Sequence, residues 1–166
     1  MSVHENAAAF KIELPQAPSF QMAGTLWRVL ATGKETGGVV GALDERCAVG
    51  PPMHAHDDAD EIFYVLDGKL TFFVGERHIE AAPGAFVYLP RYVHHGFRVD
   101  SAEAHIFNFV TPAGFERMIV DNGTPAKYDE APARPDPEQM QRQDIGAFKK
   151  LWAKYHMRVF LDENAP

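Results

Sequence analysis

The sequence is poor in cysteine and in long apolar runs. Cys47 is the only cysteine among 166 residues, which excludes an internal disulfide and any metal site built from several cysteines. No apolar run approaches the ~20 residues of a transmembrane helix, and the longest, such as residues 62–66, have the length of a strand. The N-terminus lacks a basic stretch followed by an apolar core, so we expect no signal peptide and a cytoplasmic protein.

Basic residues are also in short supply. The 16 lysines and arginines stand against 23 aspartates and glutamates, a net charge of −7 that argues against nucleic acid as a partner. We expect no membrane partner either. Hydrophobic residues make up 46% of the chain and charged residues 23%, which excludes wholesale disorder. A chain of this length is expected to form one domain with a core of its own.

Glycine and proline, by contrast, are frequent, with 13 and 12 copies, and they separate short apolar segments. Between residues 25 and 111 these segments have the length of β-strands. They cover residues 26–30, 39–43, 62–66, 70–74, 85–89 and 105–110. This spacing predicts an all-β fold, either a sandwich or a barrel.

The segment 61–74 is predicted to form a β-hairpin, because Asp67 and Gly68 make a favoured two-residue turn. In that register three pairs of residues face each other: Glu61 with Val74, Phe63 with Phe72, and Val65 with Leu70. One face of the hairpin would then be apolar apart from Glu61. Since a lone carboxylate on a buried face is costly without a partner, Glu61 is the most informative position of the segment.

The character of the chain changes at both ends. Residues 1–24 form an N-terminal segment without periodicity, residues 25–120 hold the strands and a short helix at 115–120, and residues 121–166 comprise a proline-rich linker and a C-terminal helix. The apolar residues of the first segment, Phe10, Ile12, Leu14 and Phe20, are expected to pack on the strands or on a second copy. The C-terminal helix begins at Asp136, and its residues Ile145, Phe148, Trp152 and Tyr155 recur at helical spacing. We expect this helix to pack on the strands for core formation, within a single domain.

A group of polar side chains points to a metal site. His54 and His56 are two positions apart, so on a strand their imidazoles point to the same face. Glu61 follows on the inward face of the next strand, and two nitrogens with one carboxylate oxygen suit a divalent metal ion. A further inward histidine, from the pair His94 and His95, is needed to complete the set. The competing interpretation is a group of core polar residues that hydrogen-bond without metal.

The spacing of these residues resembles the two conserved motifs of the cupin superfamily. The first motif resembles the segment Gly50-Pro51-Pro52-Met53-His54-x-His56-x4-Glu61-x6-Gly68. The second resembles Gly84-x5-Pro90-x4-His95, although Tyr92 stands where the superfamily usually has glycine and Val99 where it often has asparagine. The resemblance covers residues 25–120 and implies a jelly-roll β-barrel followed by a C-terminal α-helix. It also implies that His95 is the fourth ligand, beside His54, His56 and Glu61.

The segment 111–116 and the C-terminal helix resemble those of small single-domain quercetin-dioxygenase-like cupins. This resemblance implies a metal-dependent dioxygenase that cleaves a flavonol-like or other aromatic or enolic small molecule with O2. One divalent ion per chain is expected, of Fe, Ni, Mn, Co, Cu or Zn, because the ligand types alone do not choose between them. Glu61 is then either a ligand only or also the base that accepts the substrate's hydroxyl proton.

The substrate pocket of such an enzyme is expected among aromatic residues of the barrel. The candidates are Phe63, Phe72, Phe86, Tyr88 and His105, and for each the alternative is an ordinary role in the core. Two other functions fit the same site: a cupin isomerase or cyclase that uses the metal as a Lewis acid, and a non-catalytic small-molecule-binding cupin. The resemblance also implies a homodimer, since cupins commonly pair through sheet edges and exchanged N-terminal segments.

Overall fold

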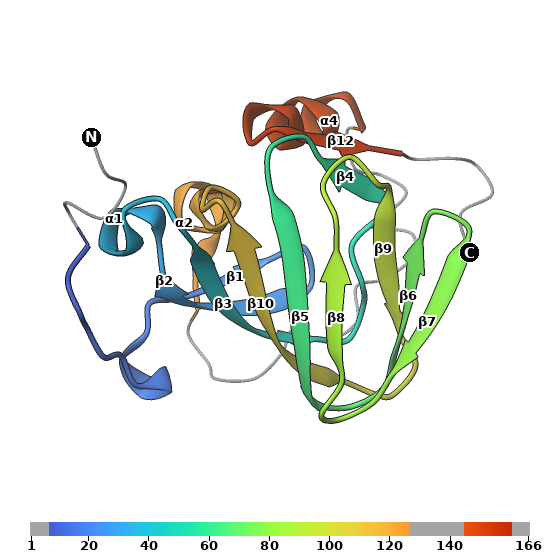
Figure 1. Ribbon diagram of the computed structural model, residues 1–166, viewed down its shortest axis with the longest axis horizontal. Coiled ribbons are helices and arrows are strands. Elements are labelled where there is room, and N and C mark those ends of the chain that lie inside the picture. The colour runs from blue at the N-terminus through green and yellow to red at the C-terminus, as the bar shows by residue number, and fades with distance from the viewer. Residues whose placement is uncertain (1–6, 127–144, 161–166) are drawn as a thin grey trace.

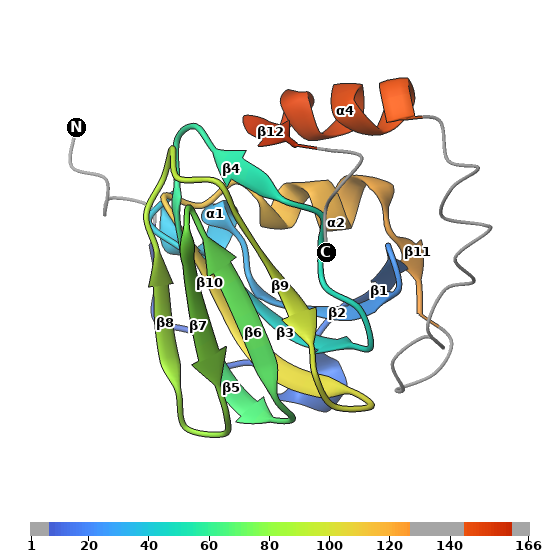
Figure 2. The same cartoon turned by 90° about the vertical axis from the view of Figure 1, so that its right-hand side faces the viewer.

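The structure is a computed structural model that describes residues 7–126 and 145–160 of the chain. Two antiparallel β-sheets face each other and enclose the core, as the two perpendicular views in Figure 1 and Figure 2 show. The all-β jelly-roll barrel with a C-terminal helix is therefore confirmed. Within these two ranges, no helix combines the length and the apolar character needed to span a membrane.

The larger sheet has the strand order β11-β1-β2-β3-β10-β5-β8 among the described residues. Its strands are β1 (Ser19–Met22), β2 (Thr25–Ala31), β3 (Gly41–Cys47), β5 (Asp60–Asp67), β8 (Phe86–Leu89), β10 (Ala104–Thr111) and β11 (Thr124–Pro125). The smaller sheet has the order β12-β4-β9-β6-β7. Its strands are β4 (His54–His56), β6 (Leu70–Val74), β7 (Arg77–Ala81), β9 (His95–Val99) and β12 (Met157–Val159). The helices are η1 (Leu14–Gln16), α1 (Gly33–Thr36), α2 (Glu116–Asn122) and α4 (Ile145–Lys154).

Each predicted apolar segment overlaps a strand, and the bounds differ by at most two residues, except that the segment 39–43 stops four residues before the end of β3. The segment 39–43, for example, enters β3 only at Gly41, and the segment 85–89 enters β8 at Phe86. The strands that the apolar runs did not predict are short or polar. β7, with the sequence Arg-His-Ile-Glu-Ala, is exposed along most of its length, so no hydrophobic run marks it.

The predicted hairpin pairing of residues 61–74 is wrong. β5 pairs with β10 and β8, whereas β6 pairs with β7 and β9, so the two strands belong to different sheets. Gly68, at a φ of 86°, turns the chain from one sheet to the other, and a Cβ there would lie 2.5 Å from the Glu103 carbonyl oxygen. The rings of Phe63 and Phe72, 5.2 Å apart, therefore meet across the barrel interior, because the two sheets bury their apolar faces against each other.

Among residues 7–126 and 145–160, the apolar core has two parts. One fills the barrel interior around Phe63, Phe72 and Phe97. The other lies where the helices pack on the strands and includes Trp27, Phe115, Met118, Ile119, Trp152 and Tyr155. The four polar residues of the predicted metal site are buried together with these clusters, so their surroundings are largely dry.

The C-terminal segment packs on the barrel through both α4 and β12. Phe148 is half-buried and Trp152 and Tyr155 are buried, as the helical spacing predicts, while the expected helix start at Asp136 lies outside the described residues. β12 pairs with β4, so that Met157 lies opposite His56 and Val159 opposite His54. Figure 1 and Figure 2 both place α4 over the end of the barrel next to β4.

The N-terminal segment is only partly buried in this chain. Phe10 is 52% exposed, whereas Ile12, Leu14 and Phe20 are half-buried, and Phe20 lies on β1. Packing on the chain's own strands thus accommodates part of the apolar surface that the sequence predicted to need cover.

Candidate metal centre

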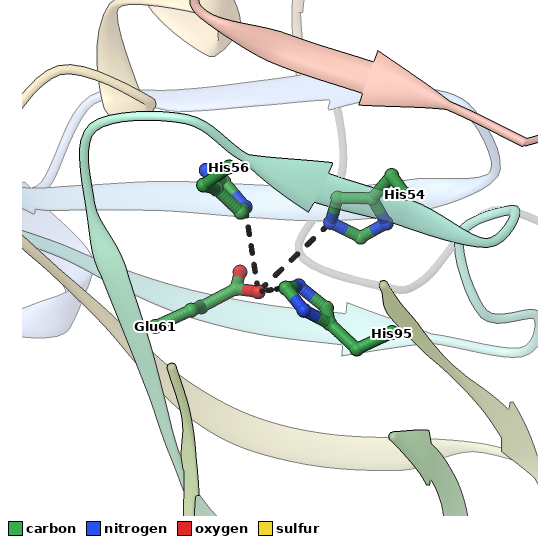
Figure 3. Close-up of side chains that lie close together, drawn as sticks. All are labelled: His54, His56, Glu61 and His95. Atoms are coloured by element: carbon green, nitrogen blue, oxygen red, sulfur yellow. Dashed lines mark hydrogen bonds and ion pairs between the residues drawn. The ribbon is translucent and has the colours of Figure 1, made fainter. Parts of the chain in front are cut away.

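Three strands bring the four predicted ligands together. His54 and His56 project from the same side of β4, Glu61 lies near the start of β5, and His95 begins β9. β4 and β9 pair directly at His54 and His95. One potential ligand atom from each of the four side chains lies within 4.8 Å of the others, as Figure 3 shows.

The carboxylate of Glu61 is the centre of this cluster. Its Oε2 atom lies 3.1 Å from His95 Nε2, 3.5 Å from His56 Nε2 and 4.0 Å from His54 Nε2. None of the four residues is more than 4% exposed. With metal–ligand bonds of about 2.0–2.2 Å, neighbouring ligand atoms lie roughly 3–4 Å apart, so this spacing suits one ion.

Backbone carbonyls fix the orientation of two of the imidazole rings. His54 Nδ1 lies 2.9 Å from the Pro52 carbonyl oxygen, and His95 Nδ1 lies 2.9 Å from the Val93 carbonyl oxygen. A carbonyl only accepts hydrogen bonds, so each Nδ1 carries the proton and donates. The Nε2 lone pairs of both rings are thereby directed at Glu61, the arrangement typical of metal-binding histidines.

These lone pairs make the cluster a good fit for a cation. An unprotonated Nε2 facing a carboxylate oxygen at 3.1 Å is repulsive unless a proton or a cation lies between them. His56 Nε2 is likewise buried and has no hydrogen-bond partner. Three imidazole nitrogens and a carboxylate oxygen are a donor set that divalent transition metals accept. The donor set thus fits the predicted divalent metal ion.

The electrostatics of the cluster favour the forms of the residues that bind metal. Burial, and secondly the neighbouring His95, lower the pKa of His54 to about 3, so this imidazole stays neutral. Burial by itself would raise the pKa of Glu61, but the contacts with His56 and His95 outweigh it and hold that pKa well below its usual range. Metal binding needs an ionised carboxylate and neutral imidazoles, and Glu61 and His54 are in these forms.

Sequence reasoning missed Asn108, which holds the other oxygen of Glu61. Asn108 Nδ2 donates a 2.7 Å hydrogen bond to Glu61 Oε1, and the side chain is 1% exposed. The signal was present in β10, where buried residues at 104, 106, 108 and 110 alternate with half-buried ones. An asparagine in the buried half of such a strand needs a polar partner in the interior.

Two aromatic side chains cover the cluster on the side of the helices. Trp152 of α4 lies 5.0 Å from His54, and Phe115, just before α2, lies 5.6 Å from His56, both edge to face. Trp152 and Phe115 are 5% and 7% exposed. The aromatic residues of the C-terminal helix thus pack in the core as expected, but Trp152 also contacts a candidate ligand.

Tyr92 lies beside the cluster in a conformation that favours glycine. Its φ is 68°, in the left-handed region, and its N–H donates a 2.8 Å hydrogen bond to the His56 carbonyl. This is the position at which the resemblance leads one to expect glycine. The hydrogen bond ties the loop before β9 to the strand that carries His54 and His56.

The predicted pocket residues do not gather around the cluster. Phe63 and Phe72 are 2% and 0% exposed and belong to the barrel core. Phe86 and Tyr88 require a correction: they lie on the outer face of β8, at 65% and 51% exposure, because Val87 and Leu89 occupy its inner face. Neither lines the barrel interior.

His105 also points away from the cluster. It lies on the face of β10 opposite to Asn108, where its Nε2 hydrogen-bonds the buried carboxylate of Asp44. Arg28 donates a 2.6 Å hydrogen bond to the same carboxylate. His105 is therefore not a pocket residue. It is a structural histidine whose hydrogen bond is satisfied, which is the alternative interpretation. His94 likewise turns aside, with its ring 5.9 Å from Phe160.

Comparison with known proteins agrees with this geometry. The cupin domain family matches residues 47–110, a range that includes all four clustered residues. Quercetin 2,3-dioxygenase of Bacillus subtilis (strain 168) is 24% identical over 140 residues, which cover 83% of this chain and 42% of that protein. The chain thus spans less than half the length of this curated relative.

Solved structures with the same barrel are more distant in sequence. An RmlC-like cupin from Shewanella frigidimarina NCIMB 400 superposes with a TM-score of 0.58 at 16% identity, over 68% of this chain and 98% of that one. The polyketide cyclase RemF from Streptomyces resistomycificus superposes with a TM-score of 0.55 at 19% identity, over 63% of this chain and 80% of that one. At these identities the likeness shows the fold alone.

Proposed function

This chain belongs to the cupin superfamily, and we propose that it is a metal-dependent dioxygenase that cleaves a flavonol-like or other aromatic, enolic small molecule with O2. The observation that carries the proposal is the similarity to quercetin 2,3-dioxygenase, which extends over 83% of this chain. The buried cluster supports it, because three imidazoles and one carboxylate leave coordination positions open for a substrate.

The proposal assigns the metal ligands to His54, His56, Glu61 and His95. A bound divalent ion would supply a Lewis acid for the enol oxygen of the substrate. The Nδ1 hydrogen bonds of His54 and His95 fix the orientation of both rings, with Nε2 turned toward Glu61. The aromatic edges of Trp152 and Phe115 keep bulk water from the cluster.

Glu61 has a second role in this proposal. Its Oε2 atom faces the three histidines, at the position where it would accept the proton that the substrate's hydroxyl group must lose. Asn108 holds Oε1, which leaves Oε2 on the side of the histidines for both tasks. In the alternative, Glu61 is a metal ligand without a role in proton transfer. The variant Glu61→Gln separates the two roles.

The decisive experiment is oxygen consumption with a panel of flavonols and related enolic aromatics. Metal-loaded protein is expected to consume O2 in step with substrate loss, and both atoms of ¹⁸O2 are expected in the cleavage products. The matched control is His78→Ala, because His78 is an exposed histidine of β7. Conversion of a substrate without O2 would instead support an isomerase or cyclase, and metal-loaded protein that binds these compounds without turnover would support a binding cupin.

A further inference from the structure

A second carboxyl group lies in the barrel interior, and the proposed metal site does not use it. Glu45 on β3 is 2% exposed. It is paired with Ile106 of the barrel core, so its side chain lies on the inner face of the larger sheet. A buried carboxyl group in a largely apolar interior needs a partner or a proton.

Asn108 connects this carboxyl to the cluster. It is paired with Leu43, two residues from Glu45 on the same face of β3. Asn108 and Glu45 are thus diagonal neighbours on the inner face of the sheet, and Asn108 Nδ2 donates a 2.7 Å hydrogen bond to Glu61 Oε1. One amide thus stands between two carboxyl groups.

If Glu45 is ionised, the side chains of Glu45, Asn108 and Glu61 have too few hydrogen-bond donors for their acceptors. Glu45 Oε1 and Asn108 Oδ1 are both buried acceptors without a partner. An ionised Glu45 only accepts hydrogen bonds, so it cannot satisfy the amide oxygen. A single proton on Glu45 supplies the missing donor and serves both atoms.

The charges around Glu45 favour that proton. Burial raises the pKa of the Glu45 carboxyl well above its usual range, and the negative charges of Glu61 and then Asp44 add to the rise against the opposing hydrogen bond from Asn108. Asp44 points to the other face of the same strand, where Arg28 and His105 hydrogen-bond it, so these two side chains serve a different carboxylate.

We propose that Glu45 is a neutral carboxylic acid that positions Glu61 through Asn108. The Glu45 hydroxyl donates to Asn108 Oδ1, and Asn108 Nδ2 donates to Glu61 Oε1. Because hydrogen bonds in a chain polarise one another, donation into the amide oxygen strengthens the amide's own donation to Glu61. Glu61 is thereby held with Oε2 toward the histidines. This inference rests on the proposed metal site, and Glu45 is a positioning residue that touches neither metal nor substrate.

The first arm of the test is infrared spectroscopy of the metal-free and metal-loaded protein at neutral pH. Protonated carboxyl groups have a carbonyl stretch that lies above the carboxylate bands and shifts in D2O. The difference spectrum between wild type and Glu45→Gln is expected to contain such a band in both states. Glu80→Gln, at an exposed position of β7, is the control and is expected to leave the band in place. A difference spectrum without this band would overturn the proposal.

The second arm measures affinity for Co²⁺ by competition with a chelator. Glu45→Gln keeps an N–H donor for Asn108 Oδ1, so its affinity is expected to stay within about threefold of wild type. Glu45→Met lacks a donor and is expected to lose about 10- to 100-fold, the usual cost of removing a partner of a metal ligand. Equal losses in both variants, or none in either, would overturn the positioning role.

The two arms are independent of dioxygenase activity. A protein that fails to consume O2 with any substrate still reports the protonation of Glu45 in its infrared spectrum. Circular dichroism shows whether Glu45→Met folds. If it does not, the infrared difference spectrum of the isosteric variant Glu45→Gln still tests the proposal. Failure of the proposed function and failure of this inference are thus distinguishable.

Discussion

The indole ring of Trp152 meets the imidazole ring of His54 edge to face, with 5.0 Å between the ring centres and 77° between the planes. Trp152 comes from α4 and His54 from β4, so the C-terminal helix lies directly against a candidate ligand. Figure 1 shows α4, in red, next to β4 at one end of the barrel. Because both residues are at least 95% buried, Trp152 closes the path to the cluster on the side of α4.

Replacing Trp152 by Ala is expected to open this path. Loss of a buried tryptophan costs about 3–5 kcal/mol of stability, and the gap would expose His54. We expect a lower melting temperature together with faster removal of bound metal by a chelator. Lys150→Ala, at an exposed position of the same helix, is the control. Unchanged chelation kinetics in Trp152→Ala would show that α4 does not limit access.

The metal content of the purified protein tests the cluster itself. We expect about one divalent ion per chain after reconstitution, because three imidazole nitrogens and one carboxylate oxygen lie within 4.8 Å of one another. His56→Ala is expected to lose most of the metal, whereas His78→Ala, which removes an exposed imidazole, keeps it. Elemental analysis gives the ratio directly. Wild-type protein that holds no metal after reconstitution would refute the site.

Glu61→Gln separates the two roles of Glu61. The amide keeps the size of the side chain and a weak oxygen ligand but cannot accept a proton at the same pH. We expect the variant to bind some metal and to lose turnover by roughly 10²-fold or more. Comparison of metal content and oxygen consumption measures both effects. Near-full activity in a metal-loaded variant would leave Glu61 as a ligand only.

The ion pair between Asp60 and Arg91 gives a prediction on acid stability. Arg91 binds both carboxylate oxygens of Asp60, through Nε at 3.0 Å and Nη2 at 3.1 Å. Hydrogen bonds from the Arg91 side chain lower the pKa of Asp60 to about 2. In the unfolded chain this pKa is about 3.9, so the pair's contribution is fully present above about pH 4. It is lost as the pH falls through about 2.

Thermal melts of Asp60→Asn across this range check the prediction. The difference in melting temperature between wild type and Asp60→Asn is expected to be constant above about pH 4 and to shrink toward lower pH. Asp58→Asn, at an exposed neighbouring position, is the control and should track wild type throughout. A difference that grows on acidification would contradict the sign of this linkage.

The outer face of the larger sheet is a candidate contact surface for the proposed homodimer. Aromatic and aliphatic side chains gather there on three adjacent strands: Ile62, Tyr64, Phe86, Tyr88, Phe107 and Phe109. Phe86 and Tyr88 are more than half exposed, and such surface favours association. We expect light scattering to return twice the chain mass of 18.5 kDa at micromolar concentration and Phe86→Asp to weaken the dimer. A mass of 18.5 kDa throughout would refute it.

The cluster itself was open to prediction from the sequence because its residues are close in the chain or at strand ends. His54 and His56 share a face by alternation alone, and no long-range pairing enters that step. Asn108 and Glu45 were not predicted, since their role depends on which strand lies beside which. Alternation in β10 was visible, but it does not say that Glu61 lies within reach.

The failed predictions share a physical cause. An Asp-Gly turn joins strands whether they pair in one ladder or separate into two sheets, so residues 61–74 gave no sign of the crossing at Gly68. The inward set of Phe63, Val65, Leu70 and Phe72 was nevertheless right, because both arrangements bury the same face. For Phe86 and Tyr88, only the pairing of β8 with β5 decides which face is inside.

The strand that carries His54 and His56 would be an open edge of its sheet without β12. β4 meets β9 at one residue pair, His54 with His95, and its other side is occupied by Met157, Arg158 and Val159. An uncovered edge strand is a template on which strands of other chains add and aggregate. The C-terminal segment therefore protects the protein from aggregation at the very strand that supplies two ligands, and chains clipped before β12 would tend to precipitate before their chemistry could be measured.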